Sequence, residues 1–262
     1  MTSMKLKIER ILTPYNFSDK NDIGRIEFIV IHYFGSLSNA KSVAQYFANA
    51  YRGASAHYIL DGGDVVYQCV EDGDIAWHCG TSGTYFHPRC RNSNSLAIEV
   101  RPQKMDQSRA GHVEDPDWFF DRETMLNLVQ FVSYLMKKYN IPIDNVLRHY
   151  DVTHKQCPRP FTGSDINKYS RISGNSAWNL FKIDILERNK VREMDGKEIF
   201  EKLMGYLNSL PTSDYAKEAS IKGIRSKIFT DGDKDGLVDN PRAFLTREQL
   251  AVVLNNAGLL DK

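Results

Sequence analysis

The sequence predicts an α/β fold with a mixed central sheet flanked by helices, followed by a small, mainly helical C-terminal module. The first observation is that short apolar runs rich in Ile and Val alternate with amphipathic stretches of helical period. Such alternation favours a sheet covered by helices. The second is a change in composition at the charged stretch 188–193. We therefore expect one large domain over residues 1–190 and a separate, smaller module over residues 191–262.

The predicted strands are short segments in which apolar and β-branched residues dominate. The segment 27–32 is almost wholly apolar and is typical of a buried strand. Asp61-Gly62-Gly63 is a hairpin turn signal between two further strands. In chain order, we predict strands at residues 27–32, 55–60, 64–69, 93–100 and 146–150.

The predicted helices have apolar residues spaced three and four apart. The longest covers residues 121–139, and shorter helices are expected at 40–51 and 177–186. Beyond the charged stretch, the same pattern predicts helices at 197–210, 214–228 and 246–255.

Composition narrows the class of protein. The chain has 262 residues and a formal net charge of +1, so nothing favours nucleic acid as a partner. No apolar run approaches the roughly 20 residues that span a bilayer, so no membrane segment is expected. Residues 1–14 are polar and lack the apolar core of a signal peptide. We therefore expect a product made in the cytoplasm that acts elsewhere only after release.

The four cysteines are too few to indicate a disulfide scaffold at this length. Cys79 and Cys90 flank a loop rich in Gly, Ser and Thr, and the sequence leaves open whether a disulfide joins them. Two reduced thiols are favoured for a cytoplasmic product.

Two histidines and a cysteine form a candidate metal site. His32 ends an apolar strand, while His149 and Cys157 lie eight residues apart around the end of the last predicted strand. Two imidazole nitrogens and one thiolate suit tetrahedral Zn²⁺, and three protein ligands leave the fourth position for water. If these residues meet in space, the chain is a zinc hydrolase with one ion per chain.

Several short motifs occur in an order that resembles a known family. They are Val30-Ile31-His32-Tyr33, Ser55-Ala56-His57-Tyr58, Ala76-Trp77-His78-Cys79-Gly80, Asn94-Ser95-Leu96-Ala97-Ile98-Glu99 and Arg148-His149-Tyr150-Asp151 with Cys157-Pro158. Together, over about residues 24–187, they resemble the zinc-dependent N-acetylmuramoyl-L-alanine amidases of the type-2 family. That family includes bacteriophage endolysins and animal peptidoglycan recognition proteins. The resemblance implies cleavage of the amide between N-acetylmuramic acid and L-alanine in peptidoglycan.

The resemblance also implies roles for individual residues. It places the zinc ligands on His32, His149 and Cys157. Lys155 matches the family's catalytic lysine. Ala56 stands where some phage relatives have a catalytic tyrosine, so the role of general base passes to Glu99. Zinc-activated water would give its proton to Glu99, and Lys155 would stabilise the oxyanion. Trp77 and His78 are expected to line the substrate cleft, with core packing an equal alternative for Trp77.

The C-terminal segment gives weaker signals. Parts of it resemble the S-layer-homology-like modules of cell-wall enzymes, which implies binding to secondary wall carbohydrate. The spacing of Asp231, Asp233 and Asp235 begins like a calcium loop, but Arg242 occupies the position of the bidentate glutamate. A solvated turn is favoured, and calcium binding stays open.

The leading functional hypothesis is an endolysin or bacterial autolysin that hydrolyses peptidoglycan. One alternative is a recognition protein that binds muropeptides without hydrolysis, but such proteins usually lose the thiolate ligand, and Cys157 is present. Another alternative is a cytoplasmic muropeptide-recycling amidase, which would not need a wall-binding module.

Overall fold

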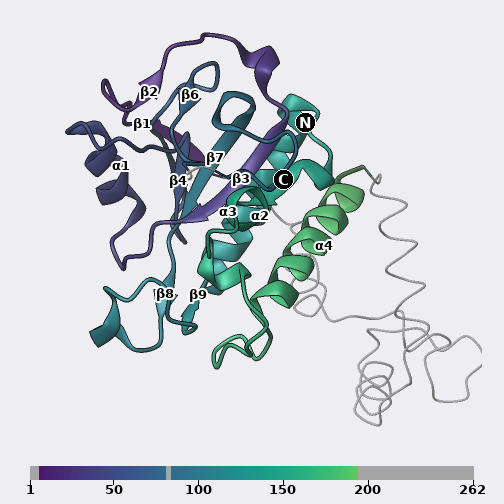
Figure 1. Cartoon of the computed structure of the whole chain (residues 1–262). Helices are drawn as coiled ribbons and strands as arrows, with labels where there is room; N and C mark the ends of the chain where they lie inside the picture. Colours follow the sequence, from purple (N-terminus) through teal and green to yellow (C-terminus); the bar gives the residue numbers. More distant parts are fainter. Residues whose placement is uncertain (1–5, 81–83, 194–262) are drawn as a thin grey trace, which may run out of the picture. The chain divides into compact units, whose positions relative to one another are not determined.

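The structure is a computed structural model that describes residues 6–80 and 84–193 (Figure 1). The described residues up to Asn189 belong to one compact unit, Ser3–Asn189. The predicted C-terminal module, its helices and its aspartate-rich loop lie outside the described residues.

A six-stranded sheet forms the centre of this unit, in the order β1-β5-β4-β7-β3-β10. Neighbouring strands are parallel except for β4 and β5, which form the antiparallel hairpin that the Asp61-Gly62-Gly63 turn predicts. The sheet is therefore mixed, as predicted. In chain order the strands are β1 (Lys7–Arg10), β3 (Phe28–Tyr33), β4 (Tyr58–Leu60), β5 (Val65–Gln68), β7 (Ser95–Val100) and β10 (Val146–Arg148).

Helices cover both faces of this sheet (Figure 1). The α-helices are α1 (Ala40–Ala48), α2 (Arg122–Tyr139), α3 (His149–Thr153) and α4 (Gly174–Glu193). Two small antiparallel pairs lie outside the main sheet: β2 (Phe17–Ser18) with β6 (Ile75–Ala76), and β8 (Gln103–Lys104) with β9 (Trp118–Phe119). Short 3₁₀ turns complete the described fold at Ile23–Arg25, Asn92–Asn94, Gln107–Arg109, Ile143–Asn145 and Arg159–Phe161.

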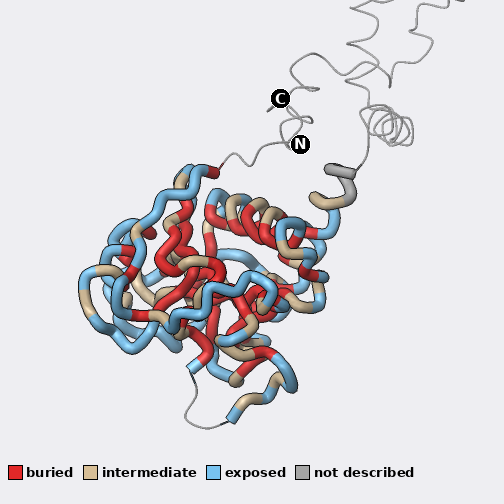
Figure 2. The backbone as a smooth tube through the Cα atoms, turned by 90° about the horizontal axis from the view of Figure 1, so that it is seen from above, coloured by how far each residue is buried: buried red, intermediate tan, exposed pale blue. Residues whose placement is uncertain are grey.

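The strand β3 shows how the two faces differ. Its Ile29, Ile31 and Tyr33 belong to the large apolar cluster that α2 and α4 complete. Phe28 and Val30 point to the opposite face and pack in a smaller cluster. Because side chains alternate along a strand, His32 lies on the same face as Val30. The buried positions are concentrated in these central strands and along the inner sides of the helices (Figure 2).

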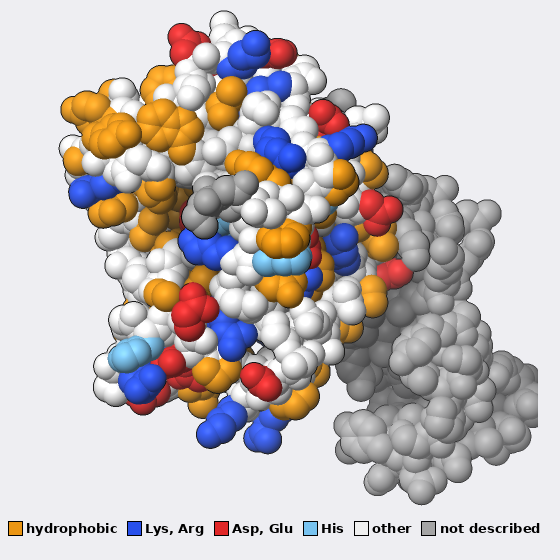
Figure 3. Space-filling view, in the orientation of Figure 1, with side chains coloured by type: hydrophobic (Ala, Val, Ile, Leu, Met, Phe, Trp, Pro, Cys, Tyr) orange, Lys and Arg blue, Asp and Glu red, His pale blue; other side chains and the backbone are white. Residues whose placement is uncertain are grey.

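The outer surface is mixed in character. On the face shown in Figure 3, acidic and basic side chains stand beside one another. No helix in the described ranges combines the length and apolar character that crossing a membrane would require.

Several elements differ from the sequence expectation. The helix expected at 177–186 is α4, which extends over Gly174–Glu193, so the charged stretch 188–193 is helical. The polar start of the chain, where no strand is predicted, contains β1. All four of its residues are exposed, and the strand joins the edge of the sheet by pairing its backbone with β5. The predicted strand 146–150 ends at Arg148, and α3 begins at His149. Asp151, the third residue of α3, stabilises this helix start, since its carboxylate accepts the backbone N–H of Arg148 at 2.8 Å in a capping box.

Candidate metal centre

The predicted ligands and base come from neighbouring strand ends. Arg148 of β10 pairs with Ile31 of β3, so the next residue, His149, lies beside His32. On the other side of β3, Glu99 of β7 pairs directly with His32. Paired residues of parallel strands share a face, and the carboxyl ends of parallel strands form one edge of the sheet. The sheet thus places His32, His149 and Glu99 side by side at its carboxyl edge.

His32, His149 and Cys157 meet at this edge. All three side chains are buried, and their candidate ligand atoms lie within 4.8 Å of one another. The ring centroids of the two histidines are 4.6 Å apart, and the Cys157 Sγ lies 3.8 Å from Nδ1 of His32. The spacing suits three ligands around one ion.

A short return loop places Cys157. The backbone N–H of Tyr150 donates to the carbonyl of Cys157 at 2.8 Å, which folds the segment after α3 back onto its first turn. Arg148 anchors that turn from the other side. Its guanidinium binds Asp151 at 2.6 Å and donates to the Phe161 carbonyl at 2.7 Å. The peptide bond between Cys157 and Pro158 is cis.

The donor atoms fit a divalent metal. Neither ring nitrogen of the buried His149 makes a well-formed hydrogen bond within the described residues, although the Gly80 carbonyl lies near the ring. Burial, assisted by Lys155, lowers the pKa of His149 to about 4, so the imidazole is the neutral form that metals bind. Burial raises the pKa of the Cys157 thiol, and the Tyr33 backbone N–H and Lys155 oppose that effect. Unpaired nitrogens beside sulfur are the donor set that zinc prefers.

A second group, His32, His78 and Cys79, also has its donor atoms within 4.8 Å of one another. Here the His78 nitrogens already have partners: Nδ1 lies 3.0 Å from Nε2 of His32, and Nε2 lies 3.1 Å from Oγ of Ser95. Binding a metal would break these contacts. The group with His149 and Cys157 is therefore the better candidate.

Glu99 is the carboxylate beside the metal group. Its Oε2 is buried and has no hydrogen-bond partner within the described part of the chain. Burial raises the pKa of Glu99 to about 7, and the positive charge of Lys155 acts in the opposite direction. A carboxyl group with a pKa near neutrality can accept and return a proton in one reaction cycle. Lys155 lies exposed, two residues before Cys157.

Trp77 and His78 point to different surroundings. The indole N–H of Trp77 donates to Ser18 at 2.9 Å, and its partly exposed ring lies edge-on against Tyr51. His78 is buried behind His32. That His78 contacts the substrate stays a prediction, and its buried position beside His32 does not favour it. Sequence reasoning missed Ser95 as a partner of His78, because only the folded sheet brings the two side chains together.

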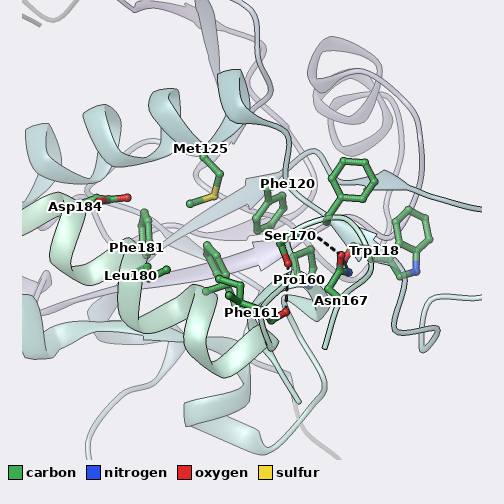
Figure 4. Close-up of a pocket in the computed structure, with 13 residues that line it drawn as sticks. Trp118, Phe120, Met125, Pro160, Phe161, Asn167, Ser170, Leu180, Phe181 and Asp184 are labelled. Atoms are coloured by element: carbon green, nitrogen blue, oxygen red, sulfur yellow. Dashed lines mark hydrogen bonds between the residues drawn. The ribbon is translucent and has the colours of Figure 1, made fainter. Parts of the chain in front are cut away.

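A separate apolar cavity of about 260 Å³ lies between α2 and α4 (Figure 4). Phe120, Met125, Phe161 and Phe181 line it, and none of the predicted site residues does. This cavity is distinct from the metal group.

Two proteins of Bacillus licheniformis are similar to this chain. A probable N-acetylmuramoyl-L-alanine amidase is 30% identical over 114 residues, covering 42% of this chain and 28% of that protein. N-acetylmuramoyl-L-alanine amidase CwlL is 26% identical over 177 residues, covering 63% of this chain and 42% of CwlL. The chain thus spans less than half the length of these two curated relatives.

A solved structure and a family match complete the comparison. The structure of a mutant endolysin from Bacillus subtilis has a TM-score of 0.50 at 22% identity, covering 69% of this chain and 99% of that one. It supports the same fold. The Amidase_2 family, described as N-acetylmuramoyl-L-alanine amidase, matches residues 22–160, which include every predicted site residue. Because this match covers 139 of 262 residues, the chain belongs to the Amidase_2 family.

Proposed function

We propose that this chain is a peptidoglycan hydrolase that cleaves the amide between N-acetylmuramic acid and L-alanine of the stem peptide. One zinc ion would be held by His32, His149 and Cys157. The observation that carries the proposal is the set of three buried donors within 4.8 Å of one another, next to Glu99 on the adjoining strand, whose Oε2 has no hydrogen-bond partner among the described residues. Family membership supplies the substrate class.

The bound ion would lower the pKa of a water molecule and polarise the scissile carbonyl. Glu99 accepts a proton at Oε2 from the water whose oxygen bonds to the carbonyl carbon. It returns that proton to the nitrogen of the leaving L-alanine as the bond between this nitrogen and the carbonyl carbon breaks. Lys155 stabilises the negative charge that develops on the carbonyl oxygen. The partly exposed Trp77 and the exposed Tyr51 offer an aromatic surface to the glycan or peptide.

Turnover of a purified muropeptide tests this proposal. The full-length chain should release free stem peptide, lose this activity in a chelator and regain it when zinc is added. A matched pair of variants, Glu99→Gln and Glu9→Gln, separates the proposed base from an exposed carboxyl on β1. Retained activity in Glu99→Gln, or release of sugar fragments in place of free peptide, would contradict the proposal.

In the cell, this chain would act on the cell wall as an endolysin or an autolysin. We propose that residues 191–262 bind secondary wall carbohydrate and perform no chemistry. The compact unit that ends at Asn189 supports a boundary there. A chain truncated after residue 190 should process soluble muropeptide at the parent rate but bind intact walls more weakly, since tethering raises local substrate concentration. Equal wall binding by both chains would exclude this role.

A further inference from the structure

A line of hydrogen-bonding groups runs from the candidate metal ligand His32 into the protein interior. Nε2 of His32 lies 3.0 Å from Nδ1 of His78, and Nε2 of His78 lies 3.1 Å from Oγ of Ser95. The Ser95 hydroxyl in turn lies 2.6 Å from the backbone carbonyl of Arg91. His32, His78 and Ser95 are all buried, so water does not compete for these contacts.

The far end of this line fixes the positions of the Ser95 and His78 protons. The Arg91 carbonyl can only accept, so the single hydroxyl proton of Ser95 points to it. Oγ of Ser95 must then accept from His78, which places the His78 proton on Nε2. A neutral His78 therefore has a bare Nδ1, which faces both Nε2 of His32 at 3.0 Å and Sγ of Cys79 at 3.1 Å. In the arrangement that we propose, a neutral His32 carries its proton on Nε2 and donates it to this nitrogen. This leaves Nδ1 of His32 without a proton, on the side where Sγ of Cys157 lies 3.8 Å away.

We propose that His78 is a positioning residue for the metal centre. It holds His32 in the tautomer and ring orientation that present Nδ1 to the ion, and Ser95 holds His78 in turn. This inference rests on the proposed metal site at His32, His149 and Cys157. It assigns His78 a role other than contact with substrate.

Contacts on several sides hold His78 in place. The side-chain oxygen of Asn92 accepts the backbone N–H groups of His78 and Cys79 at 3.3 and 2.7 Å. The His78 and His32 rings are perpendicular, with centroids 5.1 Å apart. Ser95 is the first residue of β7, a strand paired with β3. His32 and Ser95 therefore belong to neighbouring strands of the same sheet.

Zinc affinity of the full-length chain, measured by competition with a chelating dye, tests this role. His78→Phe keeps a ring but offers no acceptor, and it should weaken zinc binding roughly 10-fold to 100-fold, as is typical for such supporting residues. His78→Asn places an amide oxygen near the former Nδ1 and should restore much of the affinity. Parent affinity in a folded His78→Phe would overturn the inference.

Two further variants separate this inference from the site on which it rests. Cys157→Ser should lose most of the zinc, whereas Cys79→Ala should keep it. If Cys157→Ser keeps zinc and Cys79→Ala loses it, the metal is bound by the other group and the proposed site fails. If both behave as expected while His78→Phe binds zinc like the parent, only the role of His78 fails.

The tautomer can also be observed without any substitution. Long-range proton–nitrogen correlation spectra of the zinc-loaded, ¹⁵N-histidine-labelled chain should show the His32 proton on Nε2 and the His78 proton on Nε2. A His32 proton on Nδ1 would contradict the proposal, even if every His78 variant failed to fold.

Discussion

Replacing Glu99 by Gln should improve the stability of the metal-free protein while removing its catalysis. The pKa of Glu99 is raised by burial from its ordinary value of 4.5 to about 7. The folded state therefore holds the carboxyl proton more tightly than the unfolded state does. The stability that this proton provides is complete below pH 4.5 and is lost as the pH rises through 7.

The size of this loss follows from the shift. A difference of this size between the folded and unfolded pKa values corresponds to at most about 3 kcal/mol above pH 7. The glutamine side chain of the variant does not titrate, so Glu99→Gln should exceed the parent in unfolding free energy by up to this amount at pH 8. At pH 4 the two proteins should be nearly equal.

Urea unfolding in a chelator, at pH 4 and pH 8, provides the assay. The three tryptophans of the chain, Trp77, Trp118 and Trp178, all belong to the described unit, so their fluorescence reports on that unit. Zinc-loaded Glu99→Gln should meanwhile lose about 100-fold to 10,000-fold in kcat. A stability difference that does not depend on pH, or a parent more stable than the variant at pH 8, would refute the reasoning. Glu9→Gln, on the exposed edge strand, is the control that should change neither property.

Three other substitutions test separate parts of the account. Lys155→Ala should keep its zinc, with the metal content measured by elemental mass spectrometry. Its kcat should fall about 100-fold to 1,000-fold, and an unchanged kcat would exclude Lys155 as the group that stabilises the oxyanion. Cys157→Ser should lose most of its zinc, because a neutral hydroxyl is a poor substitute for thiolate. At Asp72, burial opposes ionisation, but hydrogen bonds from Tyr139, Tyr58 and Lys138 outweigh it and lower the pKa. Asp72→Asn should therefore lose about 2 kcal/mol of unfolding free energy at pH 7. That difference should be full above pH 3.8, the ordinary pKa, and should shrink as the pH falls below 3.8 through the lowered pKa of folded Asp72; a constant difference would contradict this.

The sequence predicts the centre of the fold because its buried strands are distinctive. The apolar runs that become β3 and β7 are long enough to identify, and the turn between β4 and β5 is typical of a hairpin. The edge strand β1 has no such pattern. Its four residues are exposed, and only backbone pairing with β5 holds it in the sheet.

The site shows the same division between local pattern and tertiary contact. The spacing of His149 and Cys157 indicates a metal site, because ligand chemistry limits which residues can serve. The partnership of His78 with Ser95 has no sequence signal. It depends on how the segment after β6 crosses the start of β7, which only the three-dimensional structure shows.

Mass spectrometry of purified cell walls after digestion tests the central claim most directly. The full-length chain with zinc should produce new amino termini on L-alanine and leave the glycan strands intact, and Glu99→Gln should produce no new amino termini. Cleaved glycan strands, or new amino termini at another residue of the peptide, would contradict the assignment of this chain as an N-acetylmuramoyl-L-alanine amidase.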